Sequence, residues 1–314
     1  MNKSSPLFSF VKKYNLLILL VIFIIIASAI SPNFFTFRNF FNLLQQSAIA
    51  GVIGMTMVCI TGGIDLSVGS AAAFAGMVAS ILVKQQGWPV ELAFPLTILM
   101  GACIGLFTGS VITRFRLPDI IATLAMLEIL RGMSLLLTDG KPVFGLSAKF
   151  RFVGAKMLWG TIPVSGLIWI FLTIAAFLVL RYLPLGRSFY SIGGNSWAAY
   201  LSGVRVKWNK TVAYVISGAL SAFAGIMLAA WLSTGQPNAA RGIEMDAIAS
   251  VVIGGTSLTG GNGGVIGTFG GVFLLTIITN ILNLIGVPSY FQQICKGLII
   301  LIALIANNYF MSKE

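Results

Sequence analysis

The chain of 314 residues is 57% hydrophobic and only 9% charged, and its formal net charge is +12. This composition and a mean hydropathy of +0.96 exclude a soluble globular domain. The apolar runs are longer than the roughly ten residues of a barrel strand, so we predict an all-helical protein that crosses a membrane several times as one domain, residues 1–314. The basic residues are spread over short loops, which favours a role in membrane orientation over nucleic-acid binding.

Few residues are of the types that metal or acid–base chemistry needs. Histidine is absent, and only eight residues are acidic. Cys59, Cys103 and Cys295 stand alone in apolar sequence, and we predict that they are small core residues. We therefore expect no metal site, no catalytic residue and no cofactor bound by this chain. The phosphate-binding pattern Gly-x-x-x-x-Gly-Lys-(Ser/Thr) is also absent from the sequence, so we expect that this chain does not itself bind ATP in that manner.

The N-terminal part predicts two helices of different kinds. Lys3, Lys12 and Lys13 precede the apolar run 16–30, which favours a first transmembrane helix with a cytoplasmic N-terminus. A cleavable signal peptide has a similar pattern and is the alternative. The aromatic-rich stretch 31–46 predicts an external helix that lies in the membrane interface.

The stretch Thr61-Gly62-Gly63-Ile64-Asp65-Leu66-Ser67 contains the first acidic residue of the chain. Gly62 and Gly63 can end one helix and turn the chain, after which Asp65 or Ser67 can cap the next helix. The positive end of that helix dipole favours a carboxylate, which is otherwise costly beside membrane spans. We assign Asp65 and Ser67 to capping and to the geometry of a gate in a translocation path.

A near copy of this turn occurs in Gly254-Gly255-Thr256-Ser257-Leu258-Thr259-Gly260-Gly261, which lacks the aspartate. Either the two helix–turn–helix units form an internal repeat, as transporter halves often do, or the glycine pattern matches by chance. Glycines at four-residue spacing also predict close helix packing, at positions 101, 105 and 109 and at positions 263, 267 and 271.

Hydropathy predicts about ten spans, several of them shorter than the about 20 residues of a full crossing. Such short spans near the glycine turns indicate discontinuous or partly buried helices. The predicted spans are residues 16–30, 47–60, 69–83, 94–113, 120–137, 164–182, 212–232, 247–253 with its continuation, 265–285 and 292–307.

The distribution of charge predicts which side of the membrane each loop occupies. With alternating sides, the cytoplasmic segments carry eleven basic and three acidic residues, and the external segments carry seven and four. This bias places both termini and the segment 185–210 in the cytoplasm, and the loop 138–163 outside.

Polar residues within the predicted spans can have either a structural role or a role in a solute pathway. Glu128 and Arg131 are three positions apart on one helix face and are predicted to form a structural ion pair, with a role in the solute pathway as the alternative. Four amides flank the turn at Gly286. They can line a path for a polyhydroxylated solute or bond helices together, and they are Asn280, Asn283, Gln292 and Gln293.

The long cytoplasmic segment 185–210 contains a short amphipathic helix between glycine breaks. It presents small residues that can fit a groove on a partner protein, whereas the alternative is a solvated loop with an interfacial helix.

Five motifs, in order along the chain, resemble the ribose-type sugar permeases of bacterial ATP-binding-cassette (ABC) importers. They are Ser31-Pro32-Asn33-Phe34-Phe35-Thr36, Gly63-Ile64-Asp65-Leu66-Ser67-Val68-Gly69-Ser70, Gly193-Gly194-Asn195 with Leu201-Ser202-Gly203, Asp246-Ala247-Ile248-Ala249, and Gly254-Gly255-Thr256-Ser257-Leu258. The likeness runs from about residue 31 to near the C-terminus.

The resemblance implies a type II importer fold, located in the bacterial inner membrane, and a set of partners. These are a second permease copy, a cytoplasmic ATPase dimer that binds ATP and Mg, and an external sugar-binding protein. It also implies an ATPase-coupling surface, made of Gly193, Gly194, Asn195, Ala198, Ala199, Leu201, Ser202 and Gly203. We therefore expect import of a pentose, hexose or similar solute by alternating access. The alternatives are a branched-chain amino acid permease and an intramembrane enzyme acting on lipid-linked sugars.

Overall fold

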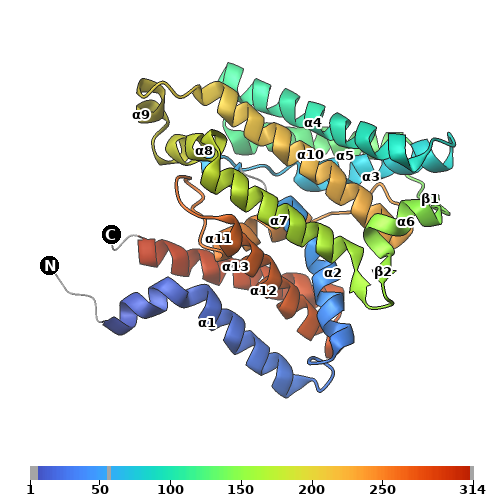
Figure 1. Cartoon of the computed structure of the whole chain (residues 1–314), viewed down its shortest axis with the longest axis horizontal. Helices are drawn as coiled ribbons and strands as arrows, with labels where there is room; N and C mark the ends of the chain where they lie inside the picture. The colour runs from blue at the N-terminus through green and yellow to red at the C-terminus, as the bar shows by residue number, and fades with distance from the viewer. Residues whose placement is uncertain (1–5, 55–57, 312–314) are drawn as a thin grey trace.

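The chain is folded mainly into helices (Figure 1). The computed structural model describes residues 6–54 and 58–311. The helices are α1 (Pro6–Ile30), α2 (Phe37–Gly54), the 3-10 helix η1 (Cys59–Thr61), α3 (Val68–Lys84), α4 (Val90–Phe115), α5 (Asp119–Leu136), α6 (Ala148–Ala155), α7 (Val164–Tyr182), α8 (Pro184–Gly194), α9 (Ser196–Leu201), α10 (Val206–Leu232), α11 (Ile243–Ile253), α12 (Val265–Leu284) and α13 (Ser289–Met311). Two-residue strands form two antiparallel pairs, β1 (Val143–Phe144) with β4 (Thr234–Gly235) and β2 (Met157–Leu158) with β3 (Ile162–Pro163).

Ten of the described helices lie at the ten predicted spans, namely α1 to α5, α7 and α10 to α13. By length and composition, α4, α7, α10 and α12 are each long and apolar enough to cross a membrane. By contrast, α11 has 11 residues, a rise of about 16 Å that covers about half of a hydrocarbon core. The predicted class, an all-helical membrane protein with several spans, some of them short, is confirmed.

The prediction of a separate interfacial helix over residues 31–46 is wrong. A turn follows α1, and α2 then runs without a break from Phe37 to Gly54. Two polar side chains of this stretch, Asn39 and Gln45, are buried inside the bundle. The Asn39 side chain exchanges hydrogen bonds with that of Asn280 on α12, and Gln45 Nε2 donates to the Gly154 carbonyl at 2.9 Å.

The core is built around α10, which packs against α2, α3, α4 and α6. Both predicted sets of small residues take part in close packing. A Cβ added to Gly105 of α4 would overlap the Tyr214 carbonyl oxygen of α10, and one added to Gly271 of α12 would overlap the Ser250 carbonyl oxygen of α11. Close backbone approach therefore replaces the hydrophobic attraction that helices lack in lipid.

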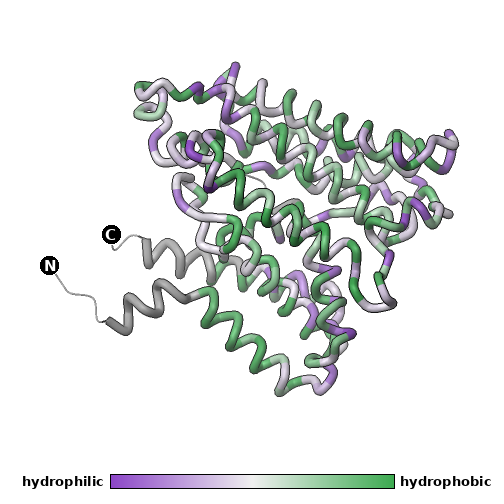
Figure 2. Tube along the Cα trace, viewed as in Figure 1, coloured by the Kyte–Doolittle hydropathy of each residue, from purple (hydrophilic) through white to green (hydrophobic). Residues whose placement is uncertain are grey.

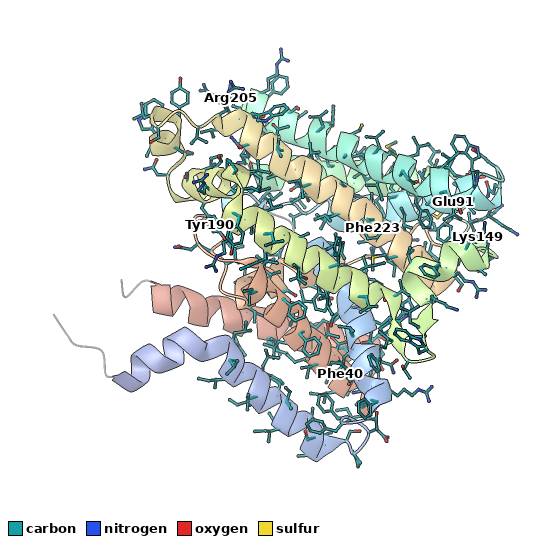
Figure 3. The ribbon with its side chains drawn as sticks, viewed as in Figure 1. Phe40, Glu91, Lys149, Tyr190, Arg205 and Phe223 are labelled. Atoms are coloured by element: carbon teal, nitrogen blue, oxygen red, sulfur yellow. The ribbon has the colours of Figure 1, made fainter. Side chains whose placement is uncertain are left out.

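Polar residues gather at two opposite ends of the bundle, and the helices between them are mainly apolar (Figure 2). At the end that carries α6, here called the α6 end, Lys149 and Glu91 form an exposed ion pair at 3.8 Å (Figure 3). Tyr190 and Arg205 lie at the opposite end with α8 and α9, here called the α9 end (Figure 3). The start of α1 and the end of α13 also lie at the α9 end (Figure 1).

Candidate functional site

Both glycine-rich turns end a helix with the same backbone motif. Gly62 after η1 has φ +77°, and Gly255 after α11 has φ +84°. The Gly63 N–H donates to the Val58 carbonyl at 3.0 Å, and the Thr256 N–H donates to the Val251 carbonyl at 3.1 Å. These are the long hydrogen bonds of a Schellman motif, whose left-handed residue is most often glycine. The equivalent positions are thus Gly62 and Gly255, one residue away from the register of the sequence pattern.

The two turns meet each other and the end of α8. The Gly261 N–H donates to the Ile60 carbonyl at 3.1 Å. A Cβ added to Gly193 of α8 would overlap both the Ile60 oxygen and the Gly261 nitrogen, and one added to Gly260 would lie 2.8 Å from the Gly193 Cα. We call this contact of Gly62, Gly193, Gly260 and Gly261 the glycine junction. It joins the end of α8, where the predicted ATPase-coupling surface begins, to the two helices that are broken at these turns, one before α3 and one after α11. We call α8 and α9 together the coupling segment.

A tyrosine and an asparagine hold the coupling segment in place. Tyr190 Oη of α8 donates to the Gly263 carbonyl, at 2.9 Å, in the loop that leads to α12. Burial raises the pKa of the Tyr190 phenol above its ordinary value, so the hydroxyl stays protonated and able to donate at physiological pH. Asn195 Oδ1 accepts from the N–H groups of Trp197 and Ala198, both at 3.0 Å, and so caps α9.

Most of the coupling surface predicted by resemblance is exposed. Ala199 is buried beneath α9, and Gly193 lies in the glycine junction, whereas Gly194, Asn195, Ala198, Leu201, Ser202 and Gly203 are exposed. Beside them, the exposed rings of Trp197 and Tyr200 stack with centroids 5.8 Å apart. The α9 end therefore carries an aromatic patch that the resemblance alone did not indicate.

Asp65 ties α3 to α10. Its Oδ1 accepts from the Ser67 N–H at 3.0 Å and from the Ser67 hydroxyl at 2.6 Å, while Oδ2 accepts from Ser217 of α10 at 2.6 Å. A second carboxylate, Glu244 of α11, packs against Gly69 in the first turn of α3. Both carboxylates thus lie at the positive end of the α3 dipole. Ser67 is the N-cap residue of α3, but no side chain makes a capping hydrogen bond there, so the expected capping by a side chain of Asp65 or Ser67 is wrong. Asp65 instead fixes the turn before α3 against α10, and a role in gating stays a prediction.

An ion pair that sequence reasoning missed lies near the same helix ends. Lys210 Nζ at the start of α10 lies 2.7 Å from Asp119 Oδ2 at the start of α5. Sequence spacing carries no signal for it, because 91 residues separate the partners.

The predicted ion pair between Glu128 and Arg131 is wrong. Arg131 Nη1 donates to the carbonyls of Pro237 at 3.0 Å and Ala239 at 2.9 Å, whereas Glu128 is exposed and makes no ion pair with Arg131 within the described residues. The reason is the irregular backbone before α11, where the carbonyls of Pro237 and Ala239 accept no backbone hydrogen bond within the described residues. A buried guanidinium satisfies them better than it pairs with a side chain on its own helix surface.

The four amides differ in their surroundings. Asn280 bonds to Asn39, and Gln292 Nε2 donates to Asn283 Oδ1 and to the Val287 carbonyl, both at 2.8 Å. Gln293 is exposed. These contacts favour helix linkage for Asn280, Asn283 and Gln292, and a place for any of the four on the solute path stays a prediction.

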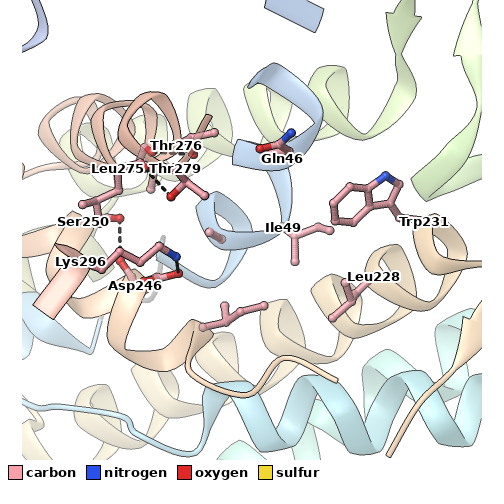
Figure 4. A pocket seen from close by; sticks show the side chains of 13 residues that line it. Gln46, Ile49, Leu228, Trp231, Asp246, Ser250, Leu275, Thr276, Thr279 and Lys296 are labelled. Carbon is pink, nitrogen blue, oxygen red and sulfur yellow. Dashed lines mark hydrogen bonds and ion pairs between the residues drawn. The ribbon is translucent and has the colours of Figure 1, made fainter. Parts of the chain in front are cut away.

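A cavity of about 150 Å³ lies between α2, α10, α11, α12 and α13 (Figure 4). Lys296 Nζ of α13 and Asp246 Oδ2 of α11 form an ion pair at 2.7 Å in its wall. Asp246 was noted in the sequence only as part of a motif, because nothing in the spacing predicts that Lys296, 50 residues away, faces it.

An all-helical bundle with ten spans, with two broken helices that meet inside it and an amphipathic segment at one end, defines a membrane permease. Residues 39–304 match the family described as the permease component of the branched-chain amino acid transport system, and the chain belongs to this family. It is therefore a transporter subunit and not an enzyme. No solved structure matches the chain.

Three relatives are similar over almost the whole chain. The ribose import permease protein of Haemophilus influenzae is 40% identical, covering 95% of this chain and 93% of that protein. The ribose import permease protein of Escherichia coli (strain K12) is 42% identical, covering 93% and 92%. The L-arabinose ABC transporter permease protein of Azospirillum brasilense is 34% identical, covering 93% and 87%.

Proposed function

We propose that the chain is the permease subunit of an ABC importer that carries a monosaccharide, or a similar polar solute, into a bacterial cell. The names of the relatives, which refer to ribose and L-arabinose, support the choice of substrate class. The observation that carries the mechanism is the glycine junction, where Gly193 packs directly on both broken helices. Because these contacts are between backbone atoms, no flexible side chain can rearrange when α8 moves. A displacement of α8 therefore also displaces η1, α3 and the loop before α12.

The coupling segment, α8 and α9, is the docking site for the ATPase that binds ATP and Mg. Trp197, Tyr200 and Leu201 of this segment are exposed and contact the ATPase. The support is chemical, because exposed large apolar side chains, and aromatic ones above all, are typical anchors of protein interfaces. Ala199 is buried, so it supports α9 from below while Ala198, Ser202 and Gly203 face the partner. Arg116, Arg205 and Lys207 line the adjoining groove and suit an acidic rim on the ATPase.

The permease acts as a homodimer, with a solute path framed by two copies. Glu128 supports this arrangement, because it is exposed near the middle of α5, and an ionised side chain facing hydrocarbon costs roughly 3 kcal/mol or more. A second copy, or the water-filled path between copies, removes that cost. Twofold symmetry is also the commonest arrangement of two identical chains.

The α9 end faces the cytoplasm, together with both termini, and the α6 end faces outward. The charge bias supports this orientation, since the segments predicted to be cytoplasmic hold eleven basic and three acidic residues. An external binding protein then delivers the solute at the α6 end.

The test is uptake of labelled D-ribose into proteoliposomes that contain the permease and its ATPase, with ATP inside and the binding protein outside. We expect uptake only when all three components are present. Uptake by the permease alone would indicate a channel or a gradient-driven carrier, and the coupling role of α8 and α9 would be withdrawn.

The second candidate is import of branched-chain amino acids, which the family description favours. Labelled L-leucine in the same proteoliposomes separates the two. The sugar assignment predicts that unlabelled L-leucine leaves D-ribose uptake unchanged, whereas inhibition by L-leucine would favour the amino acid.

A further inference from the structure

The two walls of the cavity between α2, α10, α11, α12 and α13 differ in chemistry (Figure 4). Gln46, Ile49, Leu228 and Trp231 form one wall, and the opposite wall consists of side chains from α11, α12 and α13. The volume of about 150 Å³ matches that of a cavity known in another protein to admit benzene, so one six-membered ring fits.

The first wall offers an aromatic face and free polar groups. Trp231 is 38% exposed, and neither its indole N–H nor the Gln46 amide has a hydrogen-bond partner within the described residues. An indole combines a large apolar face with one donor, and an amide both donates and accepts. A sugar ring matches this pair, because its C–H face is apolar and its hydroxyls both donate and accept.

The opposite wall adds polar groups to the apolar Val272 and Leu275, and it carries no net charge. The Asp246 and Lys296 side chains are 26% and 23% exposed, so their ion pair keeps hydrogen-bonding capacity toward the cavity. Thr276 and Thr279 donate to carbonyls one turn earlier, at 2.9 and 3.0 Å, which leaves their oxygens free to accept. Ionised side chains inside a membrane protein are costly, and they usually mark a pathway for a polar solute.

We propose that this cavity binds one uncharged monosaccharide ring, stacked on Trp231 and hydrogen-bonded to Gln46, Asp246 and Lys296. The inference rests on the proposed function and assigns the substrate contacts. It places the sugar on residues outside the amide set predicted from the sequence, because Asn280, Asn283 and Gln292 already bond within the protein.

Protection of an introduced cysteine tests the assignment directly. In a full-length permease whose native cysteines are replaced by serine, Thr279→Cys is treated with a small methanethiosulfonate reagent while D-ribose is increased. Bound sugar slows the reaction by 1 + [L]/Kd, about threefold at twice the Kd. Thr173→Cys on α7 is the matched control, because Thr173 also donates to a carbonyl one turn earlier and lies outside the cavity. No reaction at Thr279→Cys, or equal protection at both positions, would overturn the proposal.

A tryptophan pair separates stacking from general effects on the fold. Trp231→Ala is expected to raise the D-ribose concentration for half-protection of Thr279→Cys roughly tenfold, as the loss of an aromatic contact does. Trp88→Ala is the control, since Trp88 is 41% exposed and lies outside the cavity, and its shift should stay below about twofold. Equal shifts in the two variants would overturn the proposal.

Two further arms keep the test decisive. Trp231→Phe retains a ring, is expected to give an intermediate shift, and replaces the alanine variant if that variant does not fold. L-leucine replaces D-ribose in a parallel series and should not protect; protection by L-leucine in place of D-ribose would overturn the sugar assignment. Uptake that still requires the ATPase and binding protein while protection fails would overturn the cavity assignment alone.

Discussion

Single backbone atoms decide the packing at the glycine junction. Gly193 and Gly194 are neighbours in sequence, yet a Cβ on Gly193 would overlap two backbone atoms, whereas one on Gly194 would meet nothing within 4 Å. Backbone atoms cannot rotate away as a flexible side chain can, so the two glycines have different sensitivities. The same contrast separates Arg131, which is buried against carbonyls, from Glu128, which is exposed.

Gly193→Ala should destabilise the permease by about 1–3 kcal/mol through overpacking. Gly194→Ala should instead be neutral or stabilise it by up to about 1 kcal/mol, since alanine restricts the unfolded chain. Thermal unfolding of both purified variants in detergent measures the difference. Equal stabilities would mean that Gly193 does not make the contact described here.

Arg131→Met should lower stability by about 2–4 kcal/mol, because the carbonyls of Pro237 and Ala239 lose their donor. Glu128→Gln should change the stability of the detergent-solubilised subunit by no more than about 0.5 kcal/mol. The same unfolding assay compares them. Equal losses of stability in the two variants would instead indicate that Glu128 and Arg131 form an ion pair.

At the scale of elements, α9 of the coupling segment is a short helix held by its cap. A helix of six residues is too short to be stable alone, so α9 depends on Asn195 and on packing of Ala199 against the bundle. Because α9 follows directly after the glycine junction, its orientation is set by the same residues that contact the broken helices.

Asn195→Ala removes the two capping bonds of α9 and should cost about 1 kcal/mol of local stability. We expect about fivefold weaker ATPase binding, measured by co-purification across a titration of ATPase, because ordering α9 then takes part of the binding energy. Asn195→Asp keeps the acceptor and serves as the control. If the Asn195→Ala variant binds the ATPase as tightly as the unmodified permease, the capping bonds of α9 do not contribute to docking.

At the scale of the whole molecule, the exposed middle of α5 is the feature that a lone subunit leaves unexplained. Glu128 lies one helical turn from Gly132, whose Cβ position is open, so this face offers both a polar group and room for a close neighbour.

A cysteine at position 132 should therefore link two permease copies. In membranes, with the native cysteines replaced by serine, we expect oxidised Gly132→Cys to migrate mainly as a dimer. Ile174→Cys on α7, where isoleucine is 54% exposed, should remain mainly monomeric. Equal dimer yields from the two positions would remove α5 from the interface.

The order of apolar runs along the chain determined the class of protein, the ten spans and the glycine turns, because length, hydropathy and helix-ending glycines act locally. The same local information placed Asp65 in the turn before α3, but it did not indicate the hydrogen bond from Ser217 that the carboxylate accepts. The motifs that resemble those of sugar permeases are also local in sequence.

Contacts between distant segments were decided only by the tertiary structure. Arg131 donates to a carbonyl more than 100 residues away, and Asp246 pairs with Lys296. Gly193 contacts both glycine-rich turns, whereas the sequence pattern related those turns only to each other. Each of these contacts depends on which helix faces meet inside the bundle. Side-chain periodicity shows that a face is buried, but not which polar group lies opposite. For that reason Arg131 bonds to backbone carbonyls of another segment instead of forming the ion pair predicted on its own helix.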